Sequence, residues 1–222
     1  MRIALLGGTG ALGGGLALRW GRDSQHDLVI GSRDPKRARK AAGTYEAILD
    51  AHGVERSITG FENGMAAERG DVVVLAVAPC HLSDVFGDIG PRLPSDAIVV
   101  TPAVSIGDGE NGMTYEPPPQ GSVAALVREE TPARNPVVGA FHTLPADRLQ
   151  SLEESLDMHT LVFGDDEAAI ERVRSLAGEI TGLETLLAGP LENAPAVESI
   201  TPLLLTLGQQ NNTTGLGLKL TD

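Results

Sequence analysis

An apolar run that meets a cluster of glycines near the start of the chain constrains the fold more than any other feature. Residues 2–7 read Arg-Ile-Ala-Leu-Leu-Gly, and Gly8, Gly10 and Gly13 follow in the spacing Gly-x-Gly-x-x-Gly. Residues 11–21 continue with apolar side chains at helical spacing. A strand, a glycine turn and a helix in this order form the fingerprint of a dinucleotide-binding unit.

Each glycine has its own physical task in that fingerprint. Gly8 allows the tight turn, Gly10 has no Cβ and lets the backbone approach a pyrophosphate, and Gly13 lets the helix pack close to the strand. The phosphates then lie against unpaired N–H groups at the start of the helix, where the helix dipole favours anions. The alternative is a glycine-rich turn without a ligand, because a chain with 27 glycines can match this short spacing by chance.

Strands and helices that alternate along most of the chain predict an α/β fold. Runs such as residues 71–77 are apolar throughout, which is typical of strands in a parallel sheet covered on both faces. We predict strands over 2–7, 27–31, 57–60, 71–77, 97–101, 137–140, 160–164 and 185–187, and helices over 11–21, 35–51, 63–69, 80–89, 122–130, 166–178 and 190–211, the last interrupted by Pro195 and Pro202.

This alternation predicts a Rossmann-type, doubly wound, mostly parallel sheet with a small C-terminal α/β part. We expect a nucleotide-binding domain over residues 1–144 and a smaller part over residues 145–222. Residues 103–121 are rich in glycine and proline and are predicted to form one long loop, which is often functional or mobile at such a length.

The end of the second strand indicates which nicotinamide cofactor is bound. An NAD-binding unit usually places an acidic residue there to bond the ribose 2′-hydroxyl. This chain has Ser32 and Arg33 at that position, and Arg37 follows in the next helix. A guanidinium fits a phosphate and a serine adds a hydroxyl, so the set predicts a 2′-phosphate pocket and favours NADP. Asp34 is the rival for the NAD role, but its place before Pro35 favours a helix cap.

Charge and composition exclude several other classes of partner. A net charge of −13 argues against nucleic acids and anionic membranes. We expect a cytoplasmic protein, because no apolar stretch has the length of a membrane span and no signal-peptide pattern is present. Cys80 is the only cysteine, and the histidines lack ligand spacing, so no metal site is expected. Only three lysines occur, which favours a salt-rich, halophilic archaeal source over an ordinary acidic protein.

Later motifs in the chain are more specific than the glycine spacing. The motifs are Met-Arg-Ile-Ala-Leu-Leu-Gly-Gly-Thr-Gly at 1–10, Gly-Ser-Arg at 31–33, His-Thr-Leu-Pro-Ala at 142–146, Ala-Gly-Pro-Leu at 188–191 and Glu-Ser-Ile-Thr-Pro-Leu at 198–203. With these motifs the sequence resembles the NADPH-dependent reductases of the deazaflavin coenzyme F420, and the likeness spans essentially the whole chain.

The resemblance implies a Rossmann domain, a homodimer, and reversible hydride transfer between C4 of the nicotinamide and C5 of the deazaflavin. It implies pyrophosphate contacts from Thr9, Gly10, Ala11 and Leu12, 2′-phosphate contacts from Ser32, Arg33 and Arg37, nicotinamide contacts from Leu144 and Ala146, and a deazaflavin pocket formed by His142, Ser199, Thr201 and Leu216. Val77 and Ala78 are also expected at the cofactor, although the family often has proline where Ala78 stands. Ala11 replaces an amide residue that is common in the family.

Direct hydride transfer needs no nucleophile and no metal, so no catalytic residue is assigned with certainty. The protein must hold the two rings about 3–3.5 Å apart and exclude water. His142, Ser199 or Thr201 could stabilise charge on the deazaflavin, and His142 is also a candidate proton donor. The alternative for Ser199 and Thr201 is a helix-capping role.

Two other functions remain open from the sequence. One is an NADP-dependent reductase of another small acceptor, such as an imine, a keto acid or a ferric chelate. The other is a non-catalytic redox sensor that binds NADP.

Overall fold

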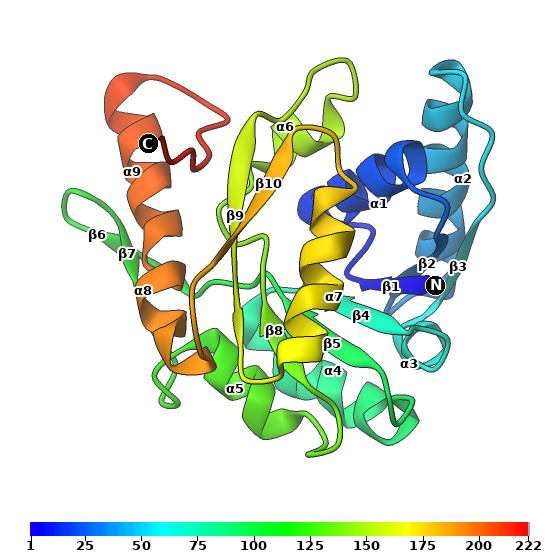
Figure 1. Ribbon diagram of the computed structural model, residues 1–222, viewed down its shortest axis with the longest axis horizontal. Coiled ribbons are helices and arrows are strands. Elements are labelled where there is room, and N and C mark those ends of the chain that lie inside the picture. Colours follow the sequence, from blue (N-terminus) through cyan, green and yellow to red (C-terminus); the bar gives the residue numbers. More distant parts are fainter. Residues whose placement is uncertain (222) are drawn as a thin grey trace.

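The computed structural model describes residues 1–221, which form one large sheet with helices on both faces (Figure 1). The sheet has eight strands in the order β10-β9-β8-β5-β4-β1-β2-β3. The strands are β1 (Arg2–Leu6), β2 (Asp27–Ser32), β3 (Ile58–Glu62), β4 (Val72–Leu75), β5 (Ile98–Thr101), β8 (Val137–Gly139), β9 (Met158–Gly164) and β10 (Leu183–Leu187). Neighbouring strands are parallel except β8 and β9, so the predicted mostly parallel α/β sheet is confirmed.

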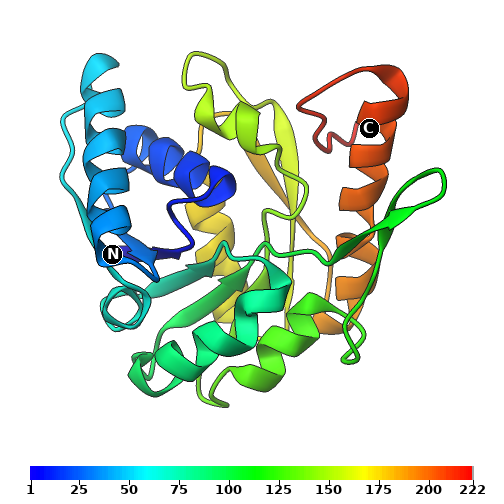
Figure 2. The same ribbon diagram turned by 180° about the vertical axis from the view of Figure 1, so that it is seen from behind.

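Two apolar cores lie on opposite faces of this sheet. Ile3 and Leu5 of β1 belong to one core and Ala4 and Leu6 to the other, because successive side chains of a strand point to opposite faces. Helices α1 (Ala11–Asp23), α2 (Pro35–Ala51) and α7 (Glu167–Gly178) cover the first face, and α3 (Asn63–Ala67), α4 (Leu82–Ile89) and α5 (Val123–Glu130) cover the second (Figure 2). The short helix α6 (Ala146–Gln150), which the sequence did not predict, packs against α1.

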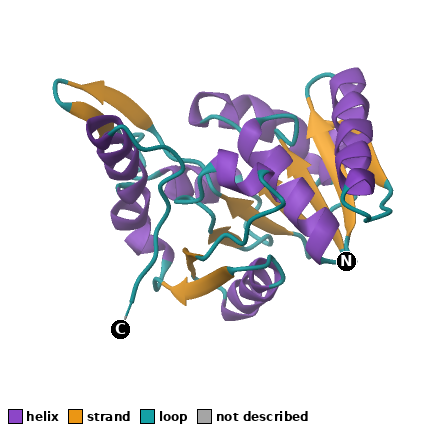
Figure 3. Ribbon diagram, turned by 90° about the horizontal axis from the view of Figure 1, so that it is seen from above, coloured by secondary structure: helices purple, strands orange, loops and turns teal. Residues whose placement is uncertain are grey.

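The C-terminal elements extend the sheet at the end opposite the N-terminus. Helices α8 (Ala194–Glu198) and α9 (Ile200–Asn211) stand beside β9 and β10, and the hairpin of β6 (Ile106–Gly109) and β7 (Gly112–Tyr115) projects next to α9 (Figure 3). Because β8 pairs with β9, the sheet runs without a break across residues 144 and 145. The division into two domains at that point stays a prediction.

The prediction of one long loop over residues 103–121 is wrong, because β6 and β7 form a hairpin inside it. The turn ends at Gly112, whose φ of 139° is open to glycine. Thr206 of α9 holds the second strand, since its hydroxyl accepts a 2.8 Å hydrogen bond from the amide of Met113. The hairpin therefore depends on a helix that lies about 90 residues further along the chain.

The prolines near the C-terminus begin helices, whereas we had predicted that they interrupt one. Pro195 stands in the first turn of α8, and Pro202 is the third residue of α9. Proline is tolerated in the first turn because those N–H groups have no partner within the helix. The break falls at Ser199 between the two helices. Among residues 1–221, we find no helix whose length and apolar character would let it cross a membrane.

Candidate functional site

The glycine turn after β1 has a geometry that only glycine allows. Gly7 has a φ of 74°, and a Cβ on it would lie 2.2 Å from the carbonyl oxygen of Ala76. The left-handed residue of the turn is therefore Gly7, so the prediction that Gly8 allows the tight turn is wrong. A Cβ on Gly13 would lie 2.8 Å from the Gly7 oxygen, which confirms the predicted close packing of α1 on the turn.

A tyrosine that the sequence reading missed holds this turn in place. The hydroxyl of Tyr45, from α2, donates a 2.8 Å hydrogen bond to the carbonyl of Gly8. Burial raises the pKa of Tyr45, so its hydroxyl keeps its proton and remains a donor. The tyrosine also explains why residue 14 is a glycine, because a Cβ at that position would lie 2.4 Å from the Tyr45 hydroxyl oxygen. No local pattern in α2 points to this contact.

A cavity of about 250 Å³ opens directly beyond the glycine turn. The cavity lies where the chain order of the sheet reverses, with β2 on one side of β1 and β4 on the other. Open α/β sheets bind dinucleotides at this switch point, beyond the carboxyl ends of the strands. The sequence-predicted residues that line it are Thr9, Gly10, Ser32, Arg33, Arg37, Val77 and Ala78. We call it the first cavity.

Arg33 and Arg37 of the first cavity are exposed and accessible to an anion, whereas the carboxylate of Asp34 caps a helix. An oxygen of Asp34 accepts a 2.8 Å hydrogen bond from the amide of Lys36, which confirms its predicted role as the cap of α2. Arg33 and Arg37 bring positive charge to a molecule that is acidic as a whole. The carboxyl end of β2 therefore has the chemistry of a phosphate site.

Ala11 and Leu12 lie behind the lining of the first cavity, in the first turn of α1. Their backbone N–H groups are among those that lack a partner within the helix and face its N-terminal end. The side chain of Leu12 packs against the core, and the carbonyl of Ala11 accepts a hydrogen bond from Gln150. Any contact of these two residues with a pyrophosphate would come from the backbone.

Asn63 is a lining residue of the first cavity that the sequence reading missed. Its side chain is buried, and its Oδ1 has no hydrogen-bond partner within the described structure. A buried amide oxygen without a partner is costly, so its place beside the cavity suits contact with a ligand. A signal did exist, because Asn63 directly follows β3, and polar residues at the carboxyl ends of parallel strands meet at one edge of the sheet.

A second cavity of about 550 Å³ lies further along the same edge, beyond β8. Its walls come from the segment between β8 and α6, from α9, from the chain after α9 and from Met113 of the hairpin. His142, Leu144, Ala146, Thr201 and Leu216 all line it. The resemblance implied nicotinamide contacts for Leu144 and Ala146 and a deazaflavin pocket for the other three, and the structure brings both groups to one cavity. Ser199 does not line it; its hydroxyl donates a 2.8 Å bond to the carbonyl of Ala196.

The imidazole of His142 stands in the wall of the second cavity without a hydrogen-bond partner in the described structure. Its ring stacks on Phe163 with centroids 5.3 Å apart, and the Thr201 hydroxyl donates a 2.9 Å bond to its carbonyl. Burial lowers the pKa of His142 to about 3. The ring is therefore neutral near pH 7 and offers one N–H donor, which favours hydrogen bonding over donation of a proton.

The residue before His142 has an unusual backbone conformation. Phe141 has a φ of 68°, which is rare for a bulky residue and usually marks a turn or a functional site. Its amide donates a 2.8 Å bond to the Thr160 hydroxyl, and its ring meets Trp20 edge to face at 5.6 Å. These contacts hold the strained turn, which directs the chain from β8 into the wall of the second cavity.

Acid should destabilise the fold through His142, and replacing this residue should remove that effect. The unfolded chain takes up a proton near the ordinary pKa of 6.5, but the folded chain does so only near 3. The contribution of His142 to the free energy of unfolding is therefore fully present above pH 6.5 and is lost as the pH falls below that value. Between pH 7 and pH 5 this loss amounts to about 2 kcal/mol. Urea unfolding at both pH values should show that extra loss in the wild type and not in His142→Gln.

The exposed His52 supplies the matched control for this prediction. His52→Gln should keep the full loss of stability between pH 7 and pH 5. Equal losses in the wild type and in His142→Gln would show that the buried imidazole is not the linked group.

Comparison with known proteins finds relatives along the whole chain. Residues 2–105 match the family model described as NADP oxidoreductase, coenzyme F420-dependent. The F420-dependent NADP reductase of Methanocaldococcus jannaschii is 36% identical over 225 residues, which span 100% of this chain and 99% of the relative. That of Methanothermobacter thermautotrophicus is 34% identical over 232 residues, 100% of this chain and 95% of the relative.

Solved structures share the fold. A candidate F420-dependent NADP reductase from Arthrobacter sp. FB24 superimposes with a TM-score of 0.79 at 22% identity, over 100% of both chains. A protein from Sinorhizobium meliloti superimposes with a TM-score of 0.69 at 23% identity, over 100% of this chain and 94% of the other. Likeness at this level of identity supports the Rossmann-type architecture alone.

Proposed function

This chain belongs to the family of F420-dependent NADP reductases, and we propose that it transfers a hydride between NADP(H) in the first cavity and coenzyme F420 in the second. The observation that carries the proposal is the position of the two cavities. Both open beyond the carboxyl ends of parallel strands in one sheet, the first around β1, β2 and β4 and the second after β8. Two ligands bound there would share one edge of the molecule.

The first cavity has the features that NADP requires. A Cβ on Gly10 would meet only the Gly7 oxygen at 3.2 Å, so the remaining space beside it is open to a pyrophosphate. Arg33 and Arg37 supply positive charge for the 2′-phosphate, and Asn63 offers a buried Oδ1 that has no hydrogen-bond partner among residues 1–221. Val77 and Ala78 close the side toward β4, where they would contact the cofactor.

The second cavity suits a flat ring with polar edges. Leu144, Leu216 and other apolar side chains form most of its wall, and hydroxyls of threonines stand between them. Thr143 Oγ1 and both ring nitrogens of His142 are buried without a partner in the described structure, so they are available to a bound carbonyl or ring nitrogen. Leu144 and Ala146 stand in the same wall and would face the nicotinamide.

When both are bound, NADPH supplies the hydride that the deazaflavin accepts. This chain's own residues would bind and orient the two rings and keep water away from them, which is most of what a direct hydride transfer needs. His142 would hold a hydrogen bond to the acceptor as charge develops on it. Its neutral state fits this role over a wide range of pH.

A single absorbance experiment tests the function. Mixing the protein with NADPH and oxidised F420 should bleach the visible deazaflavin band and the NADPH band together, in dilute buffer or in about 1 M KCl, where the Debye length is about 3 Å. Loss of both bands supports F420-dependent transfer. If neither absorbance band changes in either solution, the proposal is wrong and the non-catalytic redox sensor is favoured. If NADPH is oxidised only by an imine, a keto acid or a ferric chelate, a reductase of that acceptor is favoured. None of the comparisons favours these alternatives.

We further propose a homodimer, a cytoplasmic location and a salt-rich source. Leu203 and Leu207 are exposed one turn apart on α9, and Leu187 and Leu220 are exposed as well, which supports an apolar contact between copies. The charge of −13, with only three lysines, supports adaptation to salt. A small domain over residues 145–222 that completes the acceptor site is part of the same proposal.

A further inference from the structure

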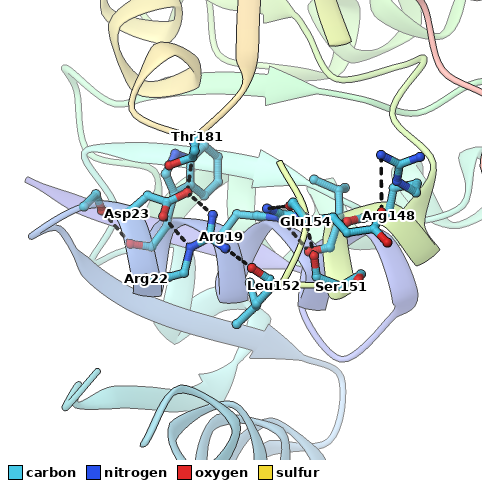
Figure 4. A network of polar contacts seen from close by, with 11 residues as sticks. Arg19, Arg22, Asp23, Arg148, Ser151, Leu152, Glu154 and Thr181 are labelled. Atoms are coloured by element: carbon cyan, nitrogen blue, oxygen red, sulfur yellow. Dashed lines mark hydrogen bonds and ion pairs between the residues drawn. The ribbon is translucent and has the colours of Figure 1, made fainter. Parts of the chain in front are cut away.

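Arg19 places a fully buried guanidinium between helix α1 and the chain that follows α6. It donates hydrogen bonds to four backbone carbonyls: Nε to Leu149 at 3.0 Å, Nη1 to Glu154 at 2.8 Å, and Nη2 to Arg148 and Ser151 at 2.6 Å each (Figure 4). A guanidinium has five N–H donors in a fixed plane, and here most of them are matched to carbonyl oxygens.

Two of the four carbonyls that Arg19 binds, those of Arg148 and Leu149, belong to the last turn of α6, while Ser151 and Glu154 follow the helix. The last carbonyls of a helix lack a partner within it, and the helix dipole makes that end negative. Arg19 therefore supplies both the donors and the positive charge that the end of α6 needs. Its neighbour Arg22 adds a bond to the carbonyl of Leu152, and Asp23 accepts one from the amide of Thr181 (Figure 4). The segment 148–154 is thus fastened to α1.

Helices α1 and α6 are also in contact nearer the N-terminus of α1. A Cβ on Gly15 would lie 2.5 Å from the Cβ of Leu149, so there is no spare room between the helices. The side chain of Gln150 donates a 2.9 Å bond to the carbonyl of Ala11, in the first turn of α1. With Arg19 at the far end of the contact, α6 is held against α1 at several points.

These two helices carry different ligand sites. The N-terminus of α1 follows Gly10, which lines the first cavity, and the N-terminus of α6 contains Ala146, which lines the second. Any shift of α6 along α1 would move the wall of the second cavity relative to the glycine turn. Arg19 lines neither cavity, so its influence on the reaction must act through α6.

On the basis of the proposed function, we propose that Arg19 is a positioning residue for hydride transfer. It fixes the wall formed by residues 142–147 relative to the NADP-binding turn, and so sets the separation of the two reacting rings. Hydride transfer depends strongly on this separation, since a displacement of about 1 Å costs roughly 100-fold in rate.

The test compares Arg19→Lys and Arg19→Met with the wild type. In single-turnover reactions with both substrates saturating, the rate should fall about 10-fold in the lysine variant and about 100-fold in the methionine variant. Lysine keeps a positive charge and part of the donors, so it should rescue part of the rate. Dissociation constants for NADPH and F420 should change by less than about 3-fold, because neither ligand touches the guanidinium. With deuterium at the transferred position of NADPH, the variants should show the full isotope effect.

Arg128 of α5 provides a matched control. Its guanidinium also binds three carbonyls, those of Asn135 at 2.6 Å, Thr131 at 2.8 Å and Pro132 at 3.0 Å, and none of these residues lines either cavity. Arg128→Lys should lower the melting temperature about as much as Arg19→Lys but leave hydride transfer unchanged. If hydride transfer is slowed equally in Arg19→Lys and Arg128→Lys, Arg19 contributes only to stability and the inference is overturned.

Hydrogen exchange separates this inference from the proposed function. Amides of residues 146–154 should exchange at least about 10-fold faster in Arg19→Lys and Arg19→Met, because the end of α6 is released. The same amides should be unchanged in Arg128→Lys. Unchanged exchange in the Arg19 variants would overturn the inference even if the wild type reduces F420. A wild type that fails to reduce F420 would remove the proposed function, while exchange would still decide whether Arg19 holds α6.

Discussion

Arg33→Ala should weaken NADPH binding by roughly 10- to 100-fold and leave NADH binding almost unchanged. Arg33 stands at the carboxyl end of β2 in the first cavity, and Arg37 follows from α2. A charge-assisted bond from a guanidinium to a phosphate is worth about 1.5–3 kcal/mol, and NADH has no 2′-phosphate to lose. Calorimetric titration with each of the two nucleotides measures the difference directly.

Arg39 is the matched control for Arg33, since it is exposed on α2, the helix that follows Arg33, and does not line the first cavity. Arg39→Ala should leave both affinities near those of the wild type. The advantage of NADPH over NADH should also shrink as salt is added, because the contact is exposed and screened. Equal losses of NADPH and NADH binding in Arg33→Ala would contradict a 2′-phosphate pocket at this position.

Glu198→Ala should lower the free energy of unfolding by at least about 3 kcal/mol, because it leaves two amides and a hydroxyl without an acceptor, at about 1–3 kcal/mol each. Glu198 is fully buried at the end of α8. Its carboxylate accepts 2.9 Å bonds from the amides of Val123 and Ala124 and a 2.8 Å bond from the hydroxyl of Tyr115. One side chain thus joins the start of α5, the hairpin and the helices beside the second cavity. Urea denaturation measures the loss.

Two further variants separate the parts of this effect. Tyr115→Phe removes one of the three bonds and should cost about 1 kcal/mol. Glu192→Ala removes an exposed glutamate from the turn before α8 and should change stability by less than about 0.5 kcal/mol. If Glu198→Ala is as stable as Glu192→Ala, the buried carboxylate does not hold these elements together.

Glu198 also shows how burial and bonding oppose each other at one group. Burial raises its pKa, and the bonds from Val123, Ala124 and Tyr115 lower it by a smaller amount. The folded chain therefore binds this proton more tightly than the unfolded chain does. The contribution of Glu198 to the free energy of unfolding therefore falls as the pH rises from the pKa of the unfolded chain to that of the folded chain. The contribution of His142 has the opposite dependence, because it falls as the pH decreases.

The first cavity was predictable because its signals are local in the sequence. Gly10 and Gly13 indicate one turn, and Ser32 and Arg33 mark the end of one strand. Asp34 marks the start of one helix. Each signal depends on the backbone conformation of a few consecutive residues, and the parallel sheet then brings the strand ends together. Even here, the exact turn residue was wrong, because the left-handed φ belongs to Gly7.

The second cavity was predictable only in part. His142 and Thr201 were named because they stand in motifs that resemble a family, and the structure places them in one wall, joined by a 2.9 Å hydrogen bond. The hairpin that brings Met113 to that wall was predicted as loop. Its four-residue strands have little apolar character of their own and are held by Thr206 of α9.

The sequence by itself determined the mostly parallel sheet, the dinucleotide turn and the preference for NADP, because glycine spacing, strand hydrophobicity and charge act between near neighbours in the chain. Only the tertiary structure decided the second cavity, the burial of His142 and Glu198, and the four bonds of Arg19. These features join segments that lie far apart in the chain, such as Arg19 and Leu149. Contacts of this kind follow from how helices and strands pack and leave no periodic pattern in the sequence.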